Sequence, residues 1–276
     1  MKKVSYIFLV FFILLIVYSL FLKLHPLKKT VFYTNEERVE EFVYSKKGYP
    51  IVLVGSSLSG AFELQSIFNQ PYFNLFLPIT GAATGIEVIR RTNKIPKELF
   101  VEINHIDRGV DSTLMHETFD EPLYTIKYDL PFLLKKNQII PNIVDRIKKP
   151  QNHIINAVQP PPVLYNALLL KAQQEWKQLP DTAKFNKELA RIKSVLADFS
   201  SKGCRIYFYE MPMDASLNNS PLLTYQRNYF TKLAAEKGYV MIKTDTSRQY
   251  LTGDGDHLLS GDADIYIKYF QGQVKQ

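Results

Sequence analysis

The stretch IVLVGSSLSG, residues 51–60, decides how the rest of the chain is interpreted. Four apolar residues, Ile51 to Val54, form a run that is typical of a buried strand in a parallel sheet. Two glycines and three serines follow this run. Small residues at this point indicate a sharp strand-to-helix turn, where functional side chains of α/β proteins often gather. The stretch therefore makes its serines candidates for chemistry.

The composition is that of a globular protein. The chain has 276 residues, 46% of them hydrophobic, and its 17 Tyr and 18 Phe offer ample surface for burial, which argues against disorder. The net charge of +7 suits an anionic partner such as lipid headgroups or a cell-wall polymer. Nucleic acid is not expected, because no basic block or nucleic-acid motif is present. The lone Cys204 excludes an intramolecular disulfide and is expected to be a buried thiol.

The N-terminus carries an uncharged apolar run over residues 4–22. About 20 such residues cross a bilayer as a helix, and the following KLHPLKK lacks the small residues of a signal-peptide cleavage site. We predict that residues 1–22 are an uncleaved transmembrane anchor, 23–49 a tether and 50–276 the main domain. Lysines flank both ends of the run, so charge bias is nearly neutral. We expect the N-terminus inside and the main domain outside.

Beyond Pro50 the chain alternates between strand and helix patterns. Strands are expected over residues 51–54, 72–77, 98–103, 205–209 and 239–242. Helices are expected over residues 61–68, 81–90, 181–201 and about 222–237, with a last one from near Asp262. This alternation predicts a three-layer α/β/α fold around a parallel sheet. Residues from about 106 to 180 interrupt it with scattered prolines, so we expect a mostly helical insertion packed over one end of the sheet.

Four loops beyond the strand ends hold polar residues: 55–59, 80–85, 104–105 and 253–257. In a parallel sheet such loops meet at one edge. They supply a serine at a helix start, a histidine and a carboxylate, which are the parts of an acyl-transfer site. His257 is the candidate base, because Asp254 lies three residues before it and can reach the ring across a tight turn. Asp256 is adjacent to it and is expected to point away into solvent.

These blocks resemble the SGNH hydrolase superfamily, also called GDSL-like, over residues of about 50–105 and 181–272. GSS at 55–57 corresponds to the nucleophile block and DGDH at 254–257 to the final D-x-x-H block. The resemblance implies an SGNH/flavodoxin-like fold in which Ser57 is the nucleophile, His257 its base and Asp254 the group that orients His257. It also implies an oxyanion hole formed by the Ser57 and Gly81 backbone N–H groups and the Asn104 side chain. It implies no cofactor and no metal.

Two departures from the family pattern bear on function. Ser56 stands where the family usually has Asp, a variant also found in membrane-anchored members that serve alginate and peptidoglycan O-acetylation and teichoic acid D-alanylation. That branch implies a bacterial cell-membrane protein with an extracytoplasmic domain, which transfers acetyl groups onto a cell-surface or exported polysaccharide. A multi-spanning membrane acyltransferase is the partner it implies. Glu102 and His105 stand where the family usually has Gly and Asp around Asn104. In this block, the family pattern for the oxyanion hole is therefore matched by Asn104 only.

Other interpretations remain open. Ser57 could cap a helix, although Ser59 is the better candidate for a cap. Asn104 could be an ordinary turn residue, and His105 could be a wall of the cleft. The protein could also be a carbohydrate or lipid esterase of the same fold, or a catalytically silent polymer-binding or scaffold subunit. The histidines and carboxylates show no metal-ligand spacing, so no metal site is predicted.

Overall fold

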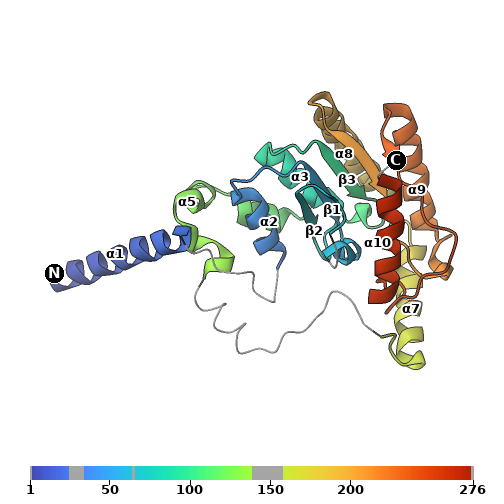
Figure 1. The fold of residues 1–276 in the computed structure, drawn as a ribbon, viewed down its shortest axis with the longest axis horizontal. Coiled ribbons are helices and arrows are strands. Elements are labelled where there is room, and N and C mark those ends of the chain that lie inside the picture. Colours follow the sequence, from blue (N-terminus) through green and yellow to red (C-terminus); the bar gives the residue numbers. More distant parts are fainter. Residues whose placement is uncertain (1, 25–33, 64–65, 139–157, 275–276) are drawn as a thin grey trace. The chain divides into compact units, whose positions relative to one another are not determined.

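The computed structural model describes residues 2–24, 34–63, 66–138 and 158–274 (Figure 1). Contacts divide the chain into two compact units. One unit comprises Met1–Lys46 and Ser112–Gln151, and the other comprises Lys47–Asp111 and Asn152–Gln276. The second unit holds the sheet and all five predicted site residues.

The second unit is built on a five-stranded sheet in the order β2-β1-β3-β4-β5, and every neighbouring pair is parallel. The strands are β1 (Ile51–Gly55), β2 (Tyr72–Phe76), β3 (Glu98–Glu102), β4 (Arg205–Tyr209) and β5 (Val240–Met241). The predicted parallel α/β sheet is thus confirmed. This order is that of flavodoxin-like sheets, in which the chain reverses its direction of winding between β1 and β3. The crevice at that reversal is where ligands bind in such folds.

Helices cover both faces of this sheet (Figure 1). On the face that carries Leu53 and Phe100, Phe270 of the last helix packs into a cluster of buried apolar residues. On the other face, Gly85 lies against Val54, and Phe230 packs on Phe208. The helices of this unit are α3 (Ala82–Thr92), α7 (Pro162–Lys177), α8 (Thr182–Ser201), α9 (Pro221–Lys237) and α10 (Ser260–Val274). The result is a three-layer arrangement.

Local sequence explains where the helices begin and end. Asp181 caps α8 by accepting hydrogen bonds from the backbone N–H groups of Ala183 and Lys184. Pro221 opens α9, and Gly238 ends it in the left-handed conformation with φ 69°. The helix expected over 61–68 is wrong. A 3-10 helix, η1 (Ser57–Glu63), takes its place, and its Ser59 carbonyl accepts a hydrogen bond from Asn74 of β2 instead of continuing an α-helix.

In the first unit, the elements found among the described residues are all helices. They are α1 (Lys2–Leu24), α2 (Asn35–Tyr44), α4 (Ser112–Phe119) and α5 (Leu123–Asp129), with short 3-10 helices η3 (Pro131–Leu133) and η4 (Lys135–Asn137). A capping box between Thr34 and Glu37 starts α2 within the predicted tether. Buried Glu40 of α2 accepts from Lys127 Nζ and from the Lys135 N–H, each at 2.7 Å.

The segment predicted as an insertion, about 106–180, is divided between the two units. Its residues 139–157 lie outside the described residues. Within the described parts of the chain, no helix combines the length and the hydropathy needed to cross a membrane.

Candidate active site

Three predicted residues meet at the carboxyl end of the sheet. Ser57 is the first residue of η1, two positions after the end of β1, and its Oγ lies 2.7 Å from Nε2 of His257. The other ring nitrogen of His257, Nδ1, lies 2.7 Å from Oδ2 of Asp254. Hydroxyl, imidazole and carboxylate therefore form one continuous hydrogen-bonded chain, in the order that serine nucleophiles need.

The turn from Asp254 to His257 explains why Asp254 orients the ring. Asp254 Oδ1 accepts from the backbone N–H groups of Asp256, at 3.0 Å, and His257, at 2.8 Å. This leaves Oδ2 to hold the imidazole. Gly255 permits the turn with φ 101°. The Gly253 N–H donates to the His257 carbonyl at 2.8 Å and closes the loop.

The pKa values of His257 and Asp254 shift in opposite directions. Burial disfavours the imidazolium, but the hydrogen bond and negative charge of Asp254 outweigh burial and raise the pKa of His257. Burial also opposes ionisation of Asp254, yet the hydrogen bonds and charge of His257 lower the pKa of its carboxyl. The carboxylate is thus ionised beside a ring that can take up a proton. This pairing suits a general base.

A buried carboxylate lies under the nucleophile turn. Glu102, the last residue of β3, accepts from the Ser56 N–H at 3.0 Å, from Ser56 Oγ at 2.6 Å and from Ser59 Oγ. Ser59 Oγ also lies 2.7 Å from Tyr209 Oη. The prediction that Ser59 caps a helix is therefore wrong, because its hydroxyl is bound to Glu102 inside η1. Ser56 instead accepts from the Leu58 N–H, at 3.2 Å.

The role of the Ser57 N–H as a donor to the oxyanion stays a prediction. The Gly81 N–H donates to the Leu77 carbonyl at 3.0 Å, so it is not free to bind an oxyanion in this structure. Asn104 is buried and exchanges two hydrogen bonds with the backbone of Met211, one from Nδ2 and one to Oδ1. Only the second hydrogen on Nδ2 is left for a substrate. Both groups follow their strands as expected, but local hydrogen bonds occupy them.

Sequence reasoning missed the contribution of α7. Trp176 packs against His105 with ring centroids 4.8 Å apart and ring planes tilted by 36°, and its Nε1 donates to Asp256 Oδ1 at 2.8 Å. Asp256 was expected to be solvated, but Trp176 holds it, and burial raises its pKa to about 6. Burial lowers the pKa of His105 well below 6.5, so its ring is neutral and serves as a wall. The only hint in the sequence was that Trp176 is the single tryptophan.

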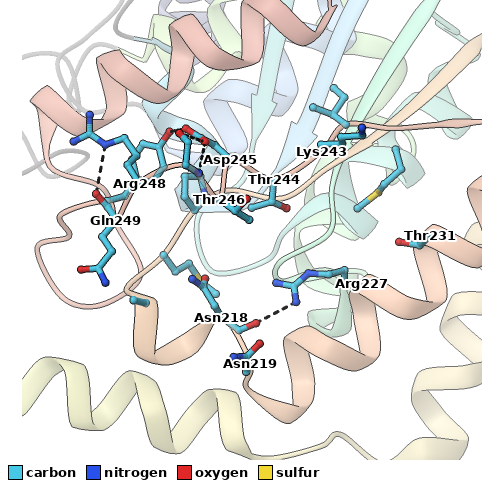
Figure 2. A pocket seen from close by; sticks show the side chains of 17 residues that line it. Asn218, Asn219, Arg227, Thr231, Lys243, Thr244, Asp245, Thr246, Arg248 and Gln249 are labelled. Atoms are coloured by element: carbon cyan, nitrogen blue, oxygen red, sulfur yellow. Dashed lines mark hydrogen bonds between the residues drawn. The ribbon is translucent and has the colours of Figure 1, made fainter.

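A separate pocket of about 980 Å³ lies between the loop after β4 and the loop after β5. Figure 2 shows Asn218 and Asn219 from the first loop, and Thr244 and Gln249 from the second. None of the three triad residues lines it. Its rim is joined to the triad turn by the Asp214 N–H, which donates to the Gly255 carbonyl at 2.8 Å.

Two of the three positive side chains that line this pocket have acidic partners, and the third is Lys243. Arg227 binds both oxygens of Glu210, and Arg248 binds Asp262. The lining therefore offers hydroxyl and amide groups more than unpaired charge. Among the residues that the structure describes, no group of His, Cys, Asp and Glu is arranged to hold a metal ion.

No protein-family model, curated protein or solved structure matches this chain.

Proposed function

We propose that the protein is a serine-dependent acyl-transfer enzyme of the SGNH type. The observation that carries the proposal is the chain of hydrogen bonds from Ser57 through His257 to Asp254, with both distances 2.7 Å. Its position at the carboxyl end of a parallel sheet is where such folds place their active sites.

In the proposed reaction, Ser57 Oγ attacks an ester carbonyl while His257 Nε2 takes the hydroxyl proton. Asp254 holds the ring and stabilises the imidazolium. The tetrahedral intermediate expels the alcohol, which receives the proton from His257, and an acyl-serine remains. An acceptor hydroxyl then attacks this ester, its proton passes to His257, and Ser57 leaves with that proton. The acceptor is a sugar hydroxyl in a transferase and water in an esterase.

We favour O-acetyl transfer onto a cell-surface or exported polysaccharide. The resemblance at residues 55–57 supports this acceptor, and so does the pocket lined with amide and hydroxyl side chains, because such groups hydrogen-bond to sugar hydroxyls. The net charge of +7 also suits an anionic polymer. An acyl donor on the other side of a membrane would require a multi-spanning acyltransferase as partner.

The proposed location is a bacterial cell membrane, with the sheet-bearing unit extracytoplasmic. The apolar run over residues 4–22 supports an anchor, as do exposed side chains of α1 such as Phe8, Phe11 and Leu14. Protease added to intact cells should cut the sheet-bearing unit. A unit that stays intact while other surface proteins are cut contradicts this orientation.

The first test measures serine-dependent turnover. Full-length protein in detergent should hydrolyse a chromogenic acetyl ester, and a fluorophosphonate should label it covalently. Ser57→Ala should abolish labelling and lower turnover by about 10³-fold or more. Ser201→Ala, at an exposed position on α8, is the matched control and should behave like wild type. Equal background turnover in wild type and Ser57→Ala, with no labelling, would instead favour a silent scaffold.

The second test identifies the acceptor. The acyl-enzyme is offered polysaccharide fragments, and the products are weighed by mass spectrometry. A gain of one acetyl mass on a fragment supports transfer. Free acetate alone, with unchanged fragments, contradicts transfer and leaves an esterase.

A further inference from the structure

We propose that Glu102 is a positioning residue, which holds the turn around Ser57 so that the nucleophile faces His257. The inference rests on the proposed role of Ser57. Glu102 does not act on substrate itself, because its side chain is buried beneath the turn and its two oxygens are taken up by Ser56 and Ser59.

The contacts of Glu102 lie on both sides of the nucleophile. Oε1 accepts from Ser56 Oγ at 2.6 Å, while Oε2 accepts from the Ser56 N–H at 3.0 Å and from Ser59 Oγ. Ser56 Oγ in turn accepts from the Leu58 N–H at 3.2 Å. One carboxylate thus fixes the residue before Ser57 and the residue two positions after it. The backbone of Ser57 between them has little freedom left.

Close packing at Gly55 supports the same role independently. A Cβ atom at this position would collide with Ser59 Oγ and lie 2.6 Å from Glu102 Oε2. The end of β1 is therefore built around the carboxylate, and it needs glycine for the close approach rather than for a left-handed turn. Tyr209 lies on β4, which pairs with β3, and its Oη is 2.7 Å from Ser59 Oγ. This contact extends the network across the three adjacent strands β1, β3 and β4.

A carboxylate suits this position better than its amide analogue. The three groups bound to Glu102 are Ser56 N–H, Ser56 O–H and Ser59 O–H, and all three donate. A carboxylate accepts at both oxygens, whereas glutamine accepts at one atom and donates at the other. Glu102→Gln therefore conserves the volume but places an N–H against at least one donor. A buried donor left without an acceptor shifts to find one, and the turn shifts with it.

The charge of Glu102 also reaches the triad. His257 faces three carboxyl groups, Asp254, Asp256 and Glu102, and each of them favours its protonated ring. Burial raises the pKa of Glu102, and the charge of Arg108 opposes that shift. Arg108 also adds to the burial that lowers the pKa of His105. At a pH where Glu102 is ionised, removing its charge should therefore move the titration of His257 to lower pH. A residue with only a structural role in the core would not move it.

The test compares Glu102→Gln and Glu102→Asp with wild type. We expect Glu102→Gln to lower kcat for the acetyl ester by about 10- to 100-fold, with KM changed less than about twofold, since a misplaced nucleophile impairs the reaction more than binding. Fluorophosphonate labelling of Ser57 should slow by a similar factor, and the acid limb of the pH–rate profile should move to lower pH. Glu102→Asp keeps the charge and should leave that limb in place while kcat still falls.

The matched control is Glu87→Gln, which removes another buried carboxylate, bound to Arg90, Arg91 and Arg191 away from the triad. It should leave kcat and the pH limb unchanged. If Glu102→Gln does not fold, Ser56→Ala and Ser59→Ala carry the test, and each should slow labelling at least threefold. If Glu102→Gln is labelled at the wild-type rate and its kcat and acid pH limb are unchanged, the inference about Glu102 is overturned and the proposed function is not. Wild type without any serine labelling would overturn the proposed function itself.

Discussion

At the scale of single residues, the two nitrogens of the His257 ring have separate partners. Nε2 faces Ser57 and Nδ1 faces Asp254, so the tautomer that carries its hydrogen on Nδ1 is the one that can accept a proton from Ser57. Asp254 is itself fixed by two backbone N–H groups. The orientation of the base is therefore determined within four residues of chain.

Asp254→Asn tests this assignment. Asparagine can turn its N–H₂ toward the ring, which favours the wrong tautomer, so we expect kcat to fall by about 10²- to 10⁴-fold. Because Asp254 raises the pKa of His257, the variant should also lose activity at a lower pH than wild type does. In wild type, kcat/KM should fall on the acid side of the profile as His257 becomes protonated. The midpoint of that fall should lie above pH 6.5, because the pKa of His257 is raised above this value. Asp198→Asn, exposed on α8, is the control, and an unchanged pH limb in Asp254→Asn contradicts the assignment.

At the scale of elements, α7 packs on the triad turn at Asp256 and at Gly255. Trp176 is buried, packs against the His105 ring and donates to Asp256. Gly255 leaves no room for a Cβ, which would lie 2.9 Å from Leu169 Cδ1 of the same helix. The helix therefore packs directly on the backbone of the turn and restricts its movement.

The contact of α7 with the turn should make stability depend on pH. Burial raises the pKa of Asp256 to about 6, from about 3.8 in the unfolded chain, so the folded state favours its neutral form. The stabilisation is complete below about pH 4 and is lost as pH rises through about 6. Asp256→Asn, which cannot ionise, should flatten this part of the stability curve. Urea unfolding between pH 4 and 7 measures it, and parallel curves for wild type and variant would contradict the prediction.

At the scale of the whole sheet-bearing unit, strand order brings the site together. The order β2-β1-β3-β4-β5 places the end of β1, with Ser57, beside the end of β3, with Glu102. The loops after β4 and β5 reach the same edge and enclose the separate pocket, next to the triad turn. Nucleophile, base and proposed acceptor pocket thus lie at one end of one sheet.

The pocket between the loops after β4 and β5 is the proposed acceptor site. If the pocket binds the sugar acceptor, Asn219→Ala combined with Gln249→Ala should raise KM for the acceptor by about 30-fold, since each of the two lost hydrogen bonds is worth about 1 kcal/mol. Hydrolysis of the small acetyl ester should stay within about twofold of wild type. Asn186→Ala, on α8 outside the pocket lining, is the control. An unchanged acceptor KM in the double variant would place the acceptor elsewhere.

The five strands and the Asp254–His257 contact were predictable because they depend on local pattern. The pairing of Ser57 with His257, 200 positions away, was expected from the resemblance and from the rule that loops after parallel strands meet at one edge. Apolar runs such as residues 51–54 must be buried on both faces wherever they pack, and the spacing of Asp254 and His257 sets their reach by turn geometry alone. The prediction of an α-helix over 61–68 was wrong because its apolar spacing is also compatible with the 3-10 helix η1.

The hydrogen-bond partners of the buried polar side chains depend on the tertiary structure. Ser59 reaches Glu102 and Tyr209, partners 43 and 150 positions away, and no local pattern reveals such pairs. The same holds for Trp176 with Asp256 and for Asn104 with Met211. The physical reason is that apolar burial follows from the order of residues along the chain. The partners of buried polar groups instead depend on which strands and helices become neighbours, and each such group must be hydrogen-bonded once water is removed.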